Sequence, residues 1–397
     1  MTIHEVHQGR LKSPFYTRMA KLDSVNQWHE WKGYSVPDEL YCAEMEYFAI
    51  RNATAVFDLT PMTKYRITGP DALPYVDRLV TRDMHKIRPG RVAYAVWCND
   101  QGQVIDDGTL FHLREGEYRL CSQERHYEWL LDAAVGFDVS VKVETNEIAA
   151  LAVQGPTSCS VLQRAGIDVA DLKPFGLTHF EFEGAELMVS RTGFTGDLGY
   201  ELWIPPDKAE ALWDAIFDAG QLTGIRAMGG DALNLARIEA GFIQAFDDFL
   251  PAMTTVRNGR SRSPLELGLE WLVDFKKPVF NGRRALAEEK RNGSTWRFVR
   301  LNIEGNKPAH HSYIYAKQKR NREAIGFVTS AAWSPVCKQN IALGTVRMPH
   351  GVVGDSVWVE IYYQREMHWS RVMARAEVVG KPFWLPPRRS ATPALPY

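Results

Sequence analysis

The chain has 397 residues and a formal net charge of −1, with 45% hydrophobic and 24% charged residues. This length exceeds one ordinary core and allows two or three modules. The charge balance gives no electrostatic basis for binding nucleic acid, and no run of about 18 apolar residues provides a membrane span, so neither partner is expected.

The first predicted elements alternate between helix and strand. Residues 38–54 carry apolar side chains at helical spacing, which predicts a helix that ends near Asn52. Alternating residues predict a strand at 64–68, and Pro70 and Asp71 then favour the start of a second helix.

A β-hairpin with an unusual acidic pair follows. Residues 91–98 (RVAYAVWC) and 104–113 predict its two strands, joined by the turn residues 99–102. The second strand carries Asp106 and Asp107, although strands are generally poor in Asp. Because neighbouring side chains on a strand point to opposite faces, at most one carboxylate can face a central cavity, and the other is expected to meet solvent or a backbone donor.

A second pattern of strands and helices comes later in the chain. Residues 186–191 predict a strand, the turn TGFTGDLG follows, and 200–205 (YELWIP) predict another strand. Asp207 is placed to cap an amphipathic helix that stops at Gly220. A further helix is expected at 231–241.

The turn between these two strands contains Gly193, Gly196 and Gly199, a spacing close to that of a dinucleotide fingerprint. A dinucleotide-binding loop leads from a strand into a helix whose N-terminus holds the pyrophosphate. This loop leads into another strand, so a structural turn with a ligand-facing edge is favoured over a nucleotide site.

The pattern changes to short β-rich runs after about residue 292. Five such runs with little helix between them predict a small all-β barrel or sandwich. The Pro-rich end, PPRRSATPALPY, is expected to be an extended surface segment.

Neither a metal centre nor a covalent nucleophile is predicted. His310 and His311 are adjacent and would point apart on a strand, and no GxSxG motif is present. The N-terminus lacks the apolar core of a secretory signal, so we expect a cytoplasmic protein with mostly buried thiols. The scattered cysteines, which suggest no disulfide framework, are Cys42, Cys98, Cys121, Cys159 and Cys337.

Taken together, eight segments resemble the aminomethyltransferase family, whose best-known member is the T-protein of the glycine cleavage system. They occur in the family's order and approximate spacing, from near Glu39 almost to the C-terminus. The segments are AVFDLTPMTKYRITGPDAL, RPGRVAYAVWCNDQGQVIDDGTL, ALAVQGP, SRTGFTGDLGYELWIP, RIEAGF, SPLELGLEWLV, FNGRRAL and GFVTSAAWSP.

This resemblance implies an α+β fold in which three modules form a ring around a central folate channel. Residues 1–291 would form two α+β modules that bind tetrahydrofolate, and residues 292–397 would form a C-terminal β-barrel-like domain. Tetrahydrofolate would lie in the channel with its pteridine buried and accept a one-carbon unit from a small donor.

The resemblance also implies roles for individual residues. Asp107, the second Asp of the IDD motif, would be the catalytic carboxylate that faces the folate nitrogens, and Asp106 would face away. Glu201 in GYELW matches the carboxylate that recognises the pteridine. Tyr94 matches a Tyr that lines the folate pocket, and Phe194 replaces the family's usual Tyr, so either could stack on the flat ring or simply pack.

Departures from the T-protein pattern shape the predicted reaction. Leu233 and Asn234 replace an Arg-Asp pair, and Ala245 replaces a Tyr. We therefore predict a tetrahydrofolate-dependent demethylase that moves a methyl group from a small N-, S- or O-methylated substrate to folate N5. The alternatives are a true aminomethyltransferase that works with a lipoyl carrier protein, and a non-catalytic folate-binding protein.

Overall fold

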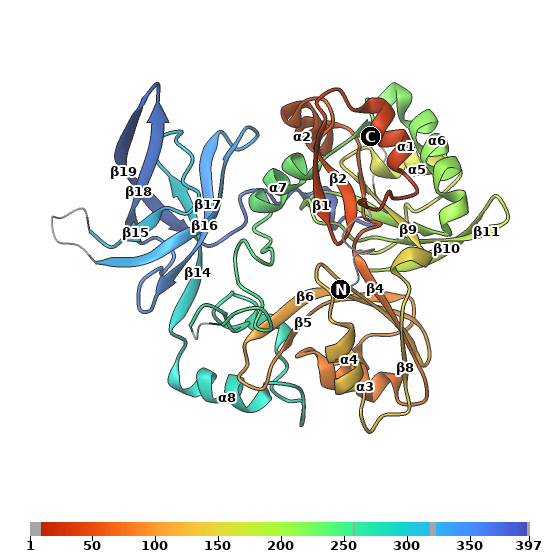
Figure 1. Ribbon diagram of the computed structural model, residues 1–397, viewed down its shortest axis with the longest axis horizontal. Helices are drawn as coiled ribbons and strands as arrows, with labels where there is room; N and C mark the ends of the chain where they lie inside the picture. The colour runs from red at the N-terminus through yellow and green to blue at the C-terminus, as the bar shows by residue number, and fades with distance from the viewer. Residues whose placement is uncertain (1–8, 257–258, 318–322, 395–397) are drawn as a thin grey trace.

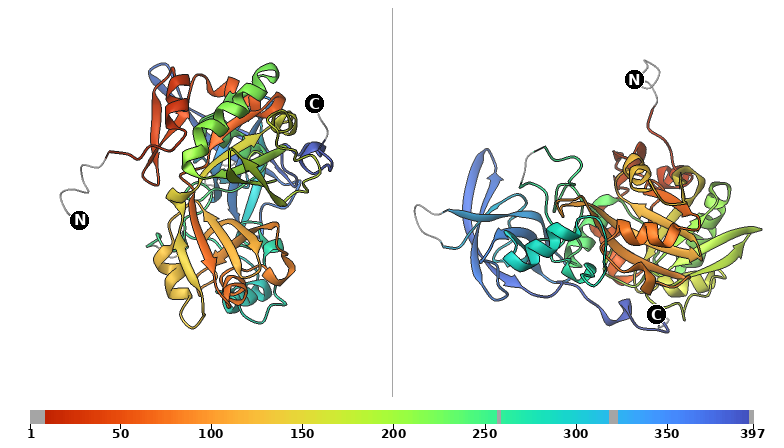
Figure 2. Two further views of the ribbon diagram at one scale, coloured as in Figure 1. Left: turned by 90° about the vertical axis from the view of Figure 1, so that its right-hand side faces the viewer. Right: turned by 90° about the horizontal axis from the view of Figure 1, so that it is seen from below.

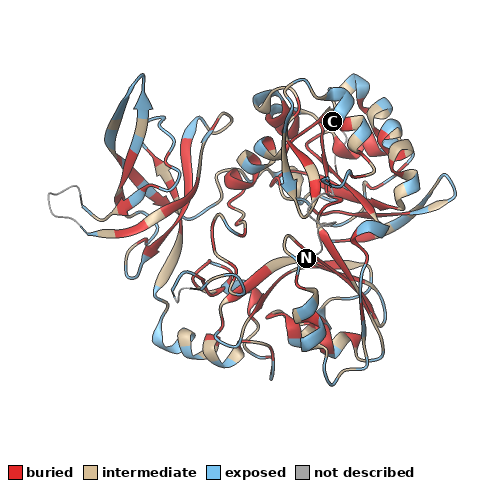
Figure 3. Ribbon diagram, viewed as in Figure 1, coloured by how far each residue is buried: buried red, intermediate tan, exposed pale blue. Residues whose placement is uncertain are grey.

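The computed structural model describes residues 9–256, 259–317 and 323–394. Three modules surround the centre of the molecule: a five-stranded sheet, a six-stranded sheet and a closed barrel (Figure 1). Buried residues concentrate in the sheets and in the segments between the modules (Figure 3). This arrangement confirms the predicted α+β class and the ring of three modules.

The five-stranded module contains the predicted hairpin. Helices α3 (Ala72–Leu79) and α4 (Tyr127–Ala133) pack on one face of its sheet, around a core that includes Tyr65, Trp97 and Tyr118. The strand order is β5-β6-β7-β4-β8, with bounds β4 (Thr63–Thr68), β5 (Arg91–Cys98), β6 (Val104–Arg114), β7 (Glu117–Ser122) and β8 (Ser140–Val143).

The six-stranded module has helices on both faces. Its strand order is β10-β11-β12-β9-β3-β13, with bounds β3 (Ala55–Asp58), β9 (Ala149–Gln154), β10 (Leu177–Phe182), β11 (Ala185–Ser190), β12 (Gly199–Ile204) and β13 (Arg226–Ala227). The apolar faces of its helices bury two clusters, one on each side of the sheet. These helices are α2 (Ala43–Asn52), α5 (Ser158–Arg164), α6 (Ala209–Gly220) and α7 (Gly230–Glu239).

The start of α2 differs from the prediction. The helix begins at Ala43, because residues up to Glu39 belong to β2 (Tyr34–Glu39), which pairs with β1 (Gln27–Trp31). The Glu46 carboxylate then accepts the Leu40 and Tyr41 amides and fixes the connection.

Asp207 does not cap α6 as expected. It lies in a short 3₁₀ turn, Pro206–Lys208, and the residue that precedes the helix is Lys208. Before the sheet, α1 (Tyr16–Leu22) packs on α6, where Arg18 forms a bidentate contact with Asp214.

The barrel is closed by six strands in the order β14-β17-β16-β15-β18-β19. The five predicted runs all lie in it, with bounds β14 (Trp296–Ile303), β16 (Ala324–Ser334), β17 (Gln339–Arg347), β18 (Ser356–Arg365) and β19 (His368–Val379). The missed strand, β15 (Tyr313–Tyr315), has three residues, too few to show a period. Helix α8 (Arg283–Asn292) precedes the barrel, and the division of the chain after residue 291 stays a proposal.

The C-terminal segment returns from the barrel to the six-stranded module (Figure 2). Its Trp384 amide donates to the Glu239 carbonyl at 2.9 Å. Arg388 donates two hydrogen bonds to Asp197, at 2.6 and 2.8 Å. The predicted surface segment is therefore tied down by specific contacts; its last residues, 395–397, lie outside the described residues.

In the part of the chain that the structure describes, we find no helix with the length and apolar character needed to cross a membrane.

Candidate functional site

Asp107 and Tyr94 share one face of the five-stranded sheet. In the β5–β6 register Val96 lies opposite Asp107 and Tyr94 lies opposite Thr109, so Tyr94 and Asp107 are diagonal neighbours. The Tyr94 hydroxyl donates a hydrogen bond of 2.7 Å to Oδ2 of Asp107. Val96 on this face packs with apolar residues of the segment 243–273, which connects the six-stranded module to the barrel. Asp107 therefore lies on the face of the five-stranded module that meets this connection.

Asp107 is half-buried, and its environment opposes its negative charge. Burial, followed by the charge of Asp106, raises the pKa of Asp107 from 3.8 to about 7, and the charge of Asp248 acts in the same direction. The hydrogen bond from Tyr94 opposes these effects. A carboxyl with this pKa changes protonation state near neutral pH, as a group that holds a proton near a reacting atom needs to do.

Asp106 faces the other way, into the core beneath α4. It has no exposed surface, and its Oδ1 accepts the Asp107 amide at 2.9 Å. Its Oδ2 accepts the Glu124 amide at 3.1 Å and lies 2.9 Å from Nε2 of His126. This confirms that one carboxylate of the pair turns away and meets a backbone donor.

Glu201 is a buried acid on β12. Its Oε2 accepts a hydrogen bond of 2.6 Å from Thr192, whose hydroxyl lies 2.7 Å from that of Ser190. Burial raises the pKa of Glu201 to about 7. Among residues 9–256, 259–317 and 323–394, no cationic side chain forms an ion pair with it. A buried acid of this kind is suited to accept N–H groups from a ligand.

The sheets that carry Asp107 and Glu201 are in contact. Phe111 on β6 and Trp203 on β12 meet edge to face, with ring centroids 5.2 Å apart. The charge of Glu201 also acts on Cys121 of β7, the strand beside β6. The two acids therefore come from adjoining faces of two modules.

Phe194 is half-buried and stacks on Phe242, with ring centroids 5.6 Å apart and an interplanar angle of 23°. The guanidinium of Arg389, from the C-terminal segment, lies 5.1 Å from the Phe242 ring centre. Phe194 thus has a packing partner within the protein, and its contact with folate stays a prediction.

The glycine-rich turn has a structural explanation. A Cβ atom on Gly193 or Gly199 would lie 2.0 or 2.2 Å from the side-chain oxygen of Gln154. The Gln154 amide nitrogen donates to the carbonyls of Thr192 and Tyr200, both at 3.2 Å. The two glycines therefore make room for a buried amide that closes the turn.

The RIEAGF segment contributes buried ion pairs that join modules. Arg237 contacts Asp248 and the hydroxyl of Ser330 in the barrel, and its Nε donates to Asn234. Glu239 pairs with Arg51 and accepts a hydrogen bond from Ser334. The departure at Asn234 is thus part of the junction that holds the barrel in place.

The histidine pair was predicted wrongly. His310 and His311 lie in a turn, where His311 has a φ of 58°, and their rings are 4.0 Å apart instead of pointing away from each other. Within the described ranges, no group of three or more His, Cys, Asp or Glu side chains could hold a metal ion.

Sequence reasoning missed Trp271 as a candidate. It is 65% exposed, and its ring centre lies 6.1 Å from that of Tyr94. A large apolar ring left this exposed beside the Tyr94–Asp107 pair extends the aromatic wall of the site. The only sequence signal was its place within SPLELGLEWLV, one of the family segments.

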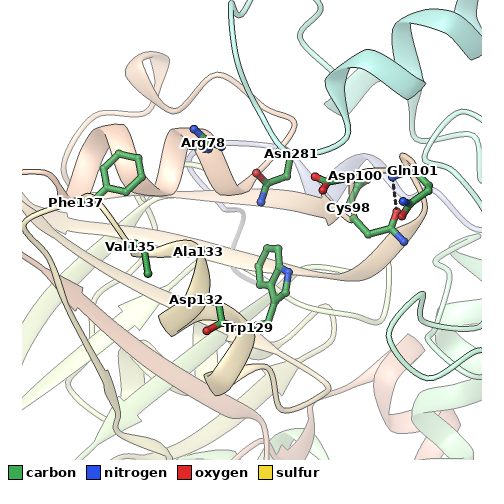
Figure 4. A pocket seen from close by; sticks show the side chains of 11 residues that line it. Arg78, Cys98, Asp100, Gln101, Trp129, Asp132, Ala133, Val135, Phe137 and Asn281 are labelled. Carbon is green, nitrogen blue, oxygen red and sulfur yellow. Dashed lines mark hydrogen bonds between the residues drawn. The ribbon is translucent and has the colours of Figure 1, made fainter.

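A surface hollow of about 410 Å³ lies elsewhere, beside the β5–β6 turn (Figure 4). Its wall includes Arg78 of α3, Trp129 of α4 and Asn281. Because its wall includes neither Asp107 nor Glu201, this hollow is separate from the candidate site.

Comparisons with known proteins show to which family the chain belongs. The family described as "GCVT N-terminal domain" matches residues 14–277, and "Glycine cleavage T-protein C-terminal barrel domain" matches 297–384. The chain is 32% identical over 337 residues to an aminomethyltransferase of Halothermothrix orenii, covering 84% of this chain and 91% of that protein. It is 30% identical over 364 residues to an aminomethyltransferase of Desulforamulus reducens, covering 89% and 93%.

The fold also matches a solved structure. The crystal structure of glycine cleavage system aminomethyltransferase T from Bartonella henselae superposes with a TM-score of 0.81 at 23% identity, covering 94% of this chain and 98% of that one. Fold and matches together define a folate-dependent one-carbon transferase. The chain belongs to the aminomethyltransferase family, which uses tetrahydrofolate.

The residues present fit such a ligand. A pterin offers a flat ring with an edge of N–H donors, and Glu201 is a buried acid without a cationic partner among the described residues. Tyr94 and Trp271 supply aromatic surface close to Asp107.

Proposed function

We propose that the chain transfers an aminomethyl-derived one-carbon unit from a lipoyl carrier protein to tetrahydrofolate. The 30–32% identity to curated aminomethyltransferases, over most of both chains, supports this reading. The observation that carries it is the pair of acids, Asp107 and Glu201, which come from adjoining sheets and both have pKa values raised to about 7.

Glu201 would hold the pteridine edge. Its carboxylate is fixed by Thr192, so it needs little reorganisation to accept two N–H groups in a bidentate arrangement. Tyr94, Trp271 and Phe194 would confine the flat ring between aromatic surfaces and exclude water from it.

Asp107 would act at the reacting edge. Tetrahydrofolate, when bound, supplies the nucleophilic nitrogen that accepts the one-carbon unit. The Asp107 carboxylate would accept the amine's hydrogen bond, orient its lone pair, and hold the proton that is released. Its charge would also stabilise the positive charge that develops during transfer, more strongly in a dry site than in water. Tyr94 would keep this carboxylate in one orientation through their hydrogen bond.

The product distinguishes the candidate reactions. The protein is mixed with tetrahydrofolate and an aminomethyl-lipoyl carrier, and 5,10-methylenetetrahydrofolate and ammonia are measured. Both should form together and depend on the carrier. If neither product appears, although an authentic T-protein reacts with the same carrier, the hypothesis of aminomethyl transfer is wrong.

A second candidate is the tetrahydrofolate-dependent demethylase, with a small N-, S- or O-methylated substrate. Leu233 and Ala245 favour it, because they stand where the T-protein pattern has an Arg and a Tyr. In the structure Ala245 is 2% exposed, and Leu233 packs partly against a core cluster. A panel of methylated donors that yields 5-methyltetrahydrofolate without a carrier would establish this reaction instead.

A further inference from the structure

A buried pair lies directly behind the candidate catalytic carboxylate. Asp106 and Asp107 are neighbours on β6, and the amide of Asp107 donates to Oδ1 of Asp106 at 2.9 Å. The other oxygen of Asp106 lies 2.9 Å from Nε2 of His126, which is 7% exposed. The chain of contacts thus runs from the imidazole, through a buried carboxylate, to the backbone of the residue that faces the site.

The surroundings fix the imidazole as well as the carboxylate. The His126 amide donates to the Tyr65 hydroxyl at 2.7 Å, just before α4 begins. Its ring meets Trp97 edge to face, with centroids 5.9 Å apart. Because both partners of the pair are buried, water screens their charges weakly, and Asp106 depends on protein donors for its stability.

The charge on Asp106 reaches Asp107. It is the largest Coulomb effect that raises the pKa of Asp107. A protonated imidazole beside Asp106 would balance that charge and so favour the ionised form of Asp107. Among the surrounding charged groups, Glu124, whose amide binds Asp106, pairs with Lys32. The charges of Arg125 and Glu128 act on the neighbouring Tyr65, and that of Asp248 acts on Asp107.

We propose that His126 is a positioning residue for the transfer reaction: through Asp106 it fixes the backbone at Asp107 and balances the negative charge behind that carboxylate. The inference rests on the proposed role of Asp107 in transfer. It adds a role for two buried residues, His126 and Asp106, that the proposed reaction does not involve. His126 touches neither ligand nor reacting atoms in this scheme.

Carboxyl titration tests the inference without any methyl or aminomethyl donor. The full-length protein is labelled with ¹³C at the Asp carboxyl carbon, and the Asp107 signal, assigned by its loss in Asp107→Asn, is followed from pH 4 to pH 9. The variants His126→Gln and Asp106→Asn are compared with the native chain. Gln keeps a donor near Asp106 but carries no charge, and Asn removes the negative charge while keeping an acceptor for the Asp107 amide.

The two variants should act in opposite directions. His126→Gln should raise the titration midpoint of Asp107 by about one pH unit, since the Asp106 charge is no longer balanced, and Asp106→Asn should lower it by a similar amount. The matched control is His112→Gln. His112 is a buried histidine on the same strand, 3% exposed and bonded to the Ile87 carbonyl, and this control should leave the midpoint unchanged.

Each outcome decides the matter. An unchanged midpoint in His126→Gln, or a shift of the same sign in both variants, would overturn the positioning role. If His126→Gln does not fold, His126→Asn replaces it with the same expected rise, and an unchanged midpoint there overturns the positioning role. A midpoint that fails to fall in Asp106→Asn contradicts the charge coupling. The Asp107 midpoint could shift in opposite directions in the two variants while Asp107→Asn keeps full transfer activity. That result would support the charge coupling but refute the proposed function of Asp107, so the experiments distinguish a failure of this inference from a failure of the proposed function.

Discussion

Replacing Asp107 with Asn is expected to stabilise the protein above pH 7 while it slows transfer. The native carboxyl holds its proton up to about pH 7 in the folded state, because burial and the Asp106 charge raise its pKa. In the unfolded chain the same group loses its proton near pH 4. Between these limits the folded state binds more protons, so the native protein loses stability as the pH rises.

The size of this loss follows from the pKa. A rise from 3.8 to about 7 corresponds to about 4 kcal/mol by linkage. Asp107 keeps part of its surface exposed, so solvent screening reduces the effect, and we expect a gain of about 2 kcal/mol for Asp107→Asn above pH 8. At pH 4.5 the folded Asp107 carboxyl is protonated and only the unfolded chain has lost most of its proton, so the gain should fall to about a quarter of its value above pH 8. Loss of the ionisable group should slow transfer by about 10²–10⁴-fold.

The gain in unfolding free energy is measured by denaturant unfolding at pH 4.5, 6, 7 and 8.5. The native chain, Asp107→Asn and a control variant are compared. The control is Asp100→Asn, an exposed carboxyl in the turn of the same hairpin, which should show no pH-dependent gain. A difference between Asp107→Asn and the native chain that stays constant with pH would refute the assignment of a raised pKa. Unchanged transfer in this variant would show that Asp107 takes no part in the reaction, whereas a native chain that binds folate but transfers nothing would support a non-catalytic folate-binding protein.

Three further substitutions test neighbouring parts of the site. Glu201→Gln should weaken tetrahydrofolate binding by about 10–100-fold in calorimetry, since a bidentate acceptor is lost; equal affinity would remove Glu201 from the pteridine site. Tyr94→Phe deletes the hydrogen bond that lowers the pKa of Asp107, so the acid limb of the pH–rate profile should move to higher pH, and a fixed limb would contradict the pairing. Gly193→Ala should destabilise the protein by about 1–3 kcal/mol, because the added Cβ clashes with Gln154, and its melting temperature should fall. An unchanged melting temperature would show that the turn can relax.

Sequence patterns predicted the longer strands. The hairpin strands β5 and β6 and the five longer barrel strands each span 8 to 12 residues between turns, which is long enough for a strand-like composition or a period to be recognised. The three residues of β15 show no such period, and its pairing depends on β16 and β18. The start of α2 is set by the Glu46 carboxylate and by pairing with β1, which are contacts that periodicity does not report.

The candidate site divides in the same way. Because side chains alternate along β6, only one of Asp106 and Asp107 could face a cavity. The family resemblance then indicated that this residue is Asp107. The contact of Asp106 with His126 could not be predicted, because His126 lies 20 residues away, just before α4. Trp271 was missed for a similar reason: its contact with Tyr94 joins segments far apart in the chain.

The position of β3 has a consequence for how the ring is made during synthesis. This strand is translated before the whole five-stranded module, yet its neighbours β9 and β13 come after that module. Residues 63–143 can therefore fold during synthesis while the apolar strand β3, which precedes them, is still unpaired. Closure of the ring comes late, and a chain stalled before residue 149 would expose this strand to chaperones or to aggregation.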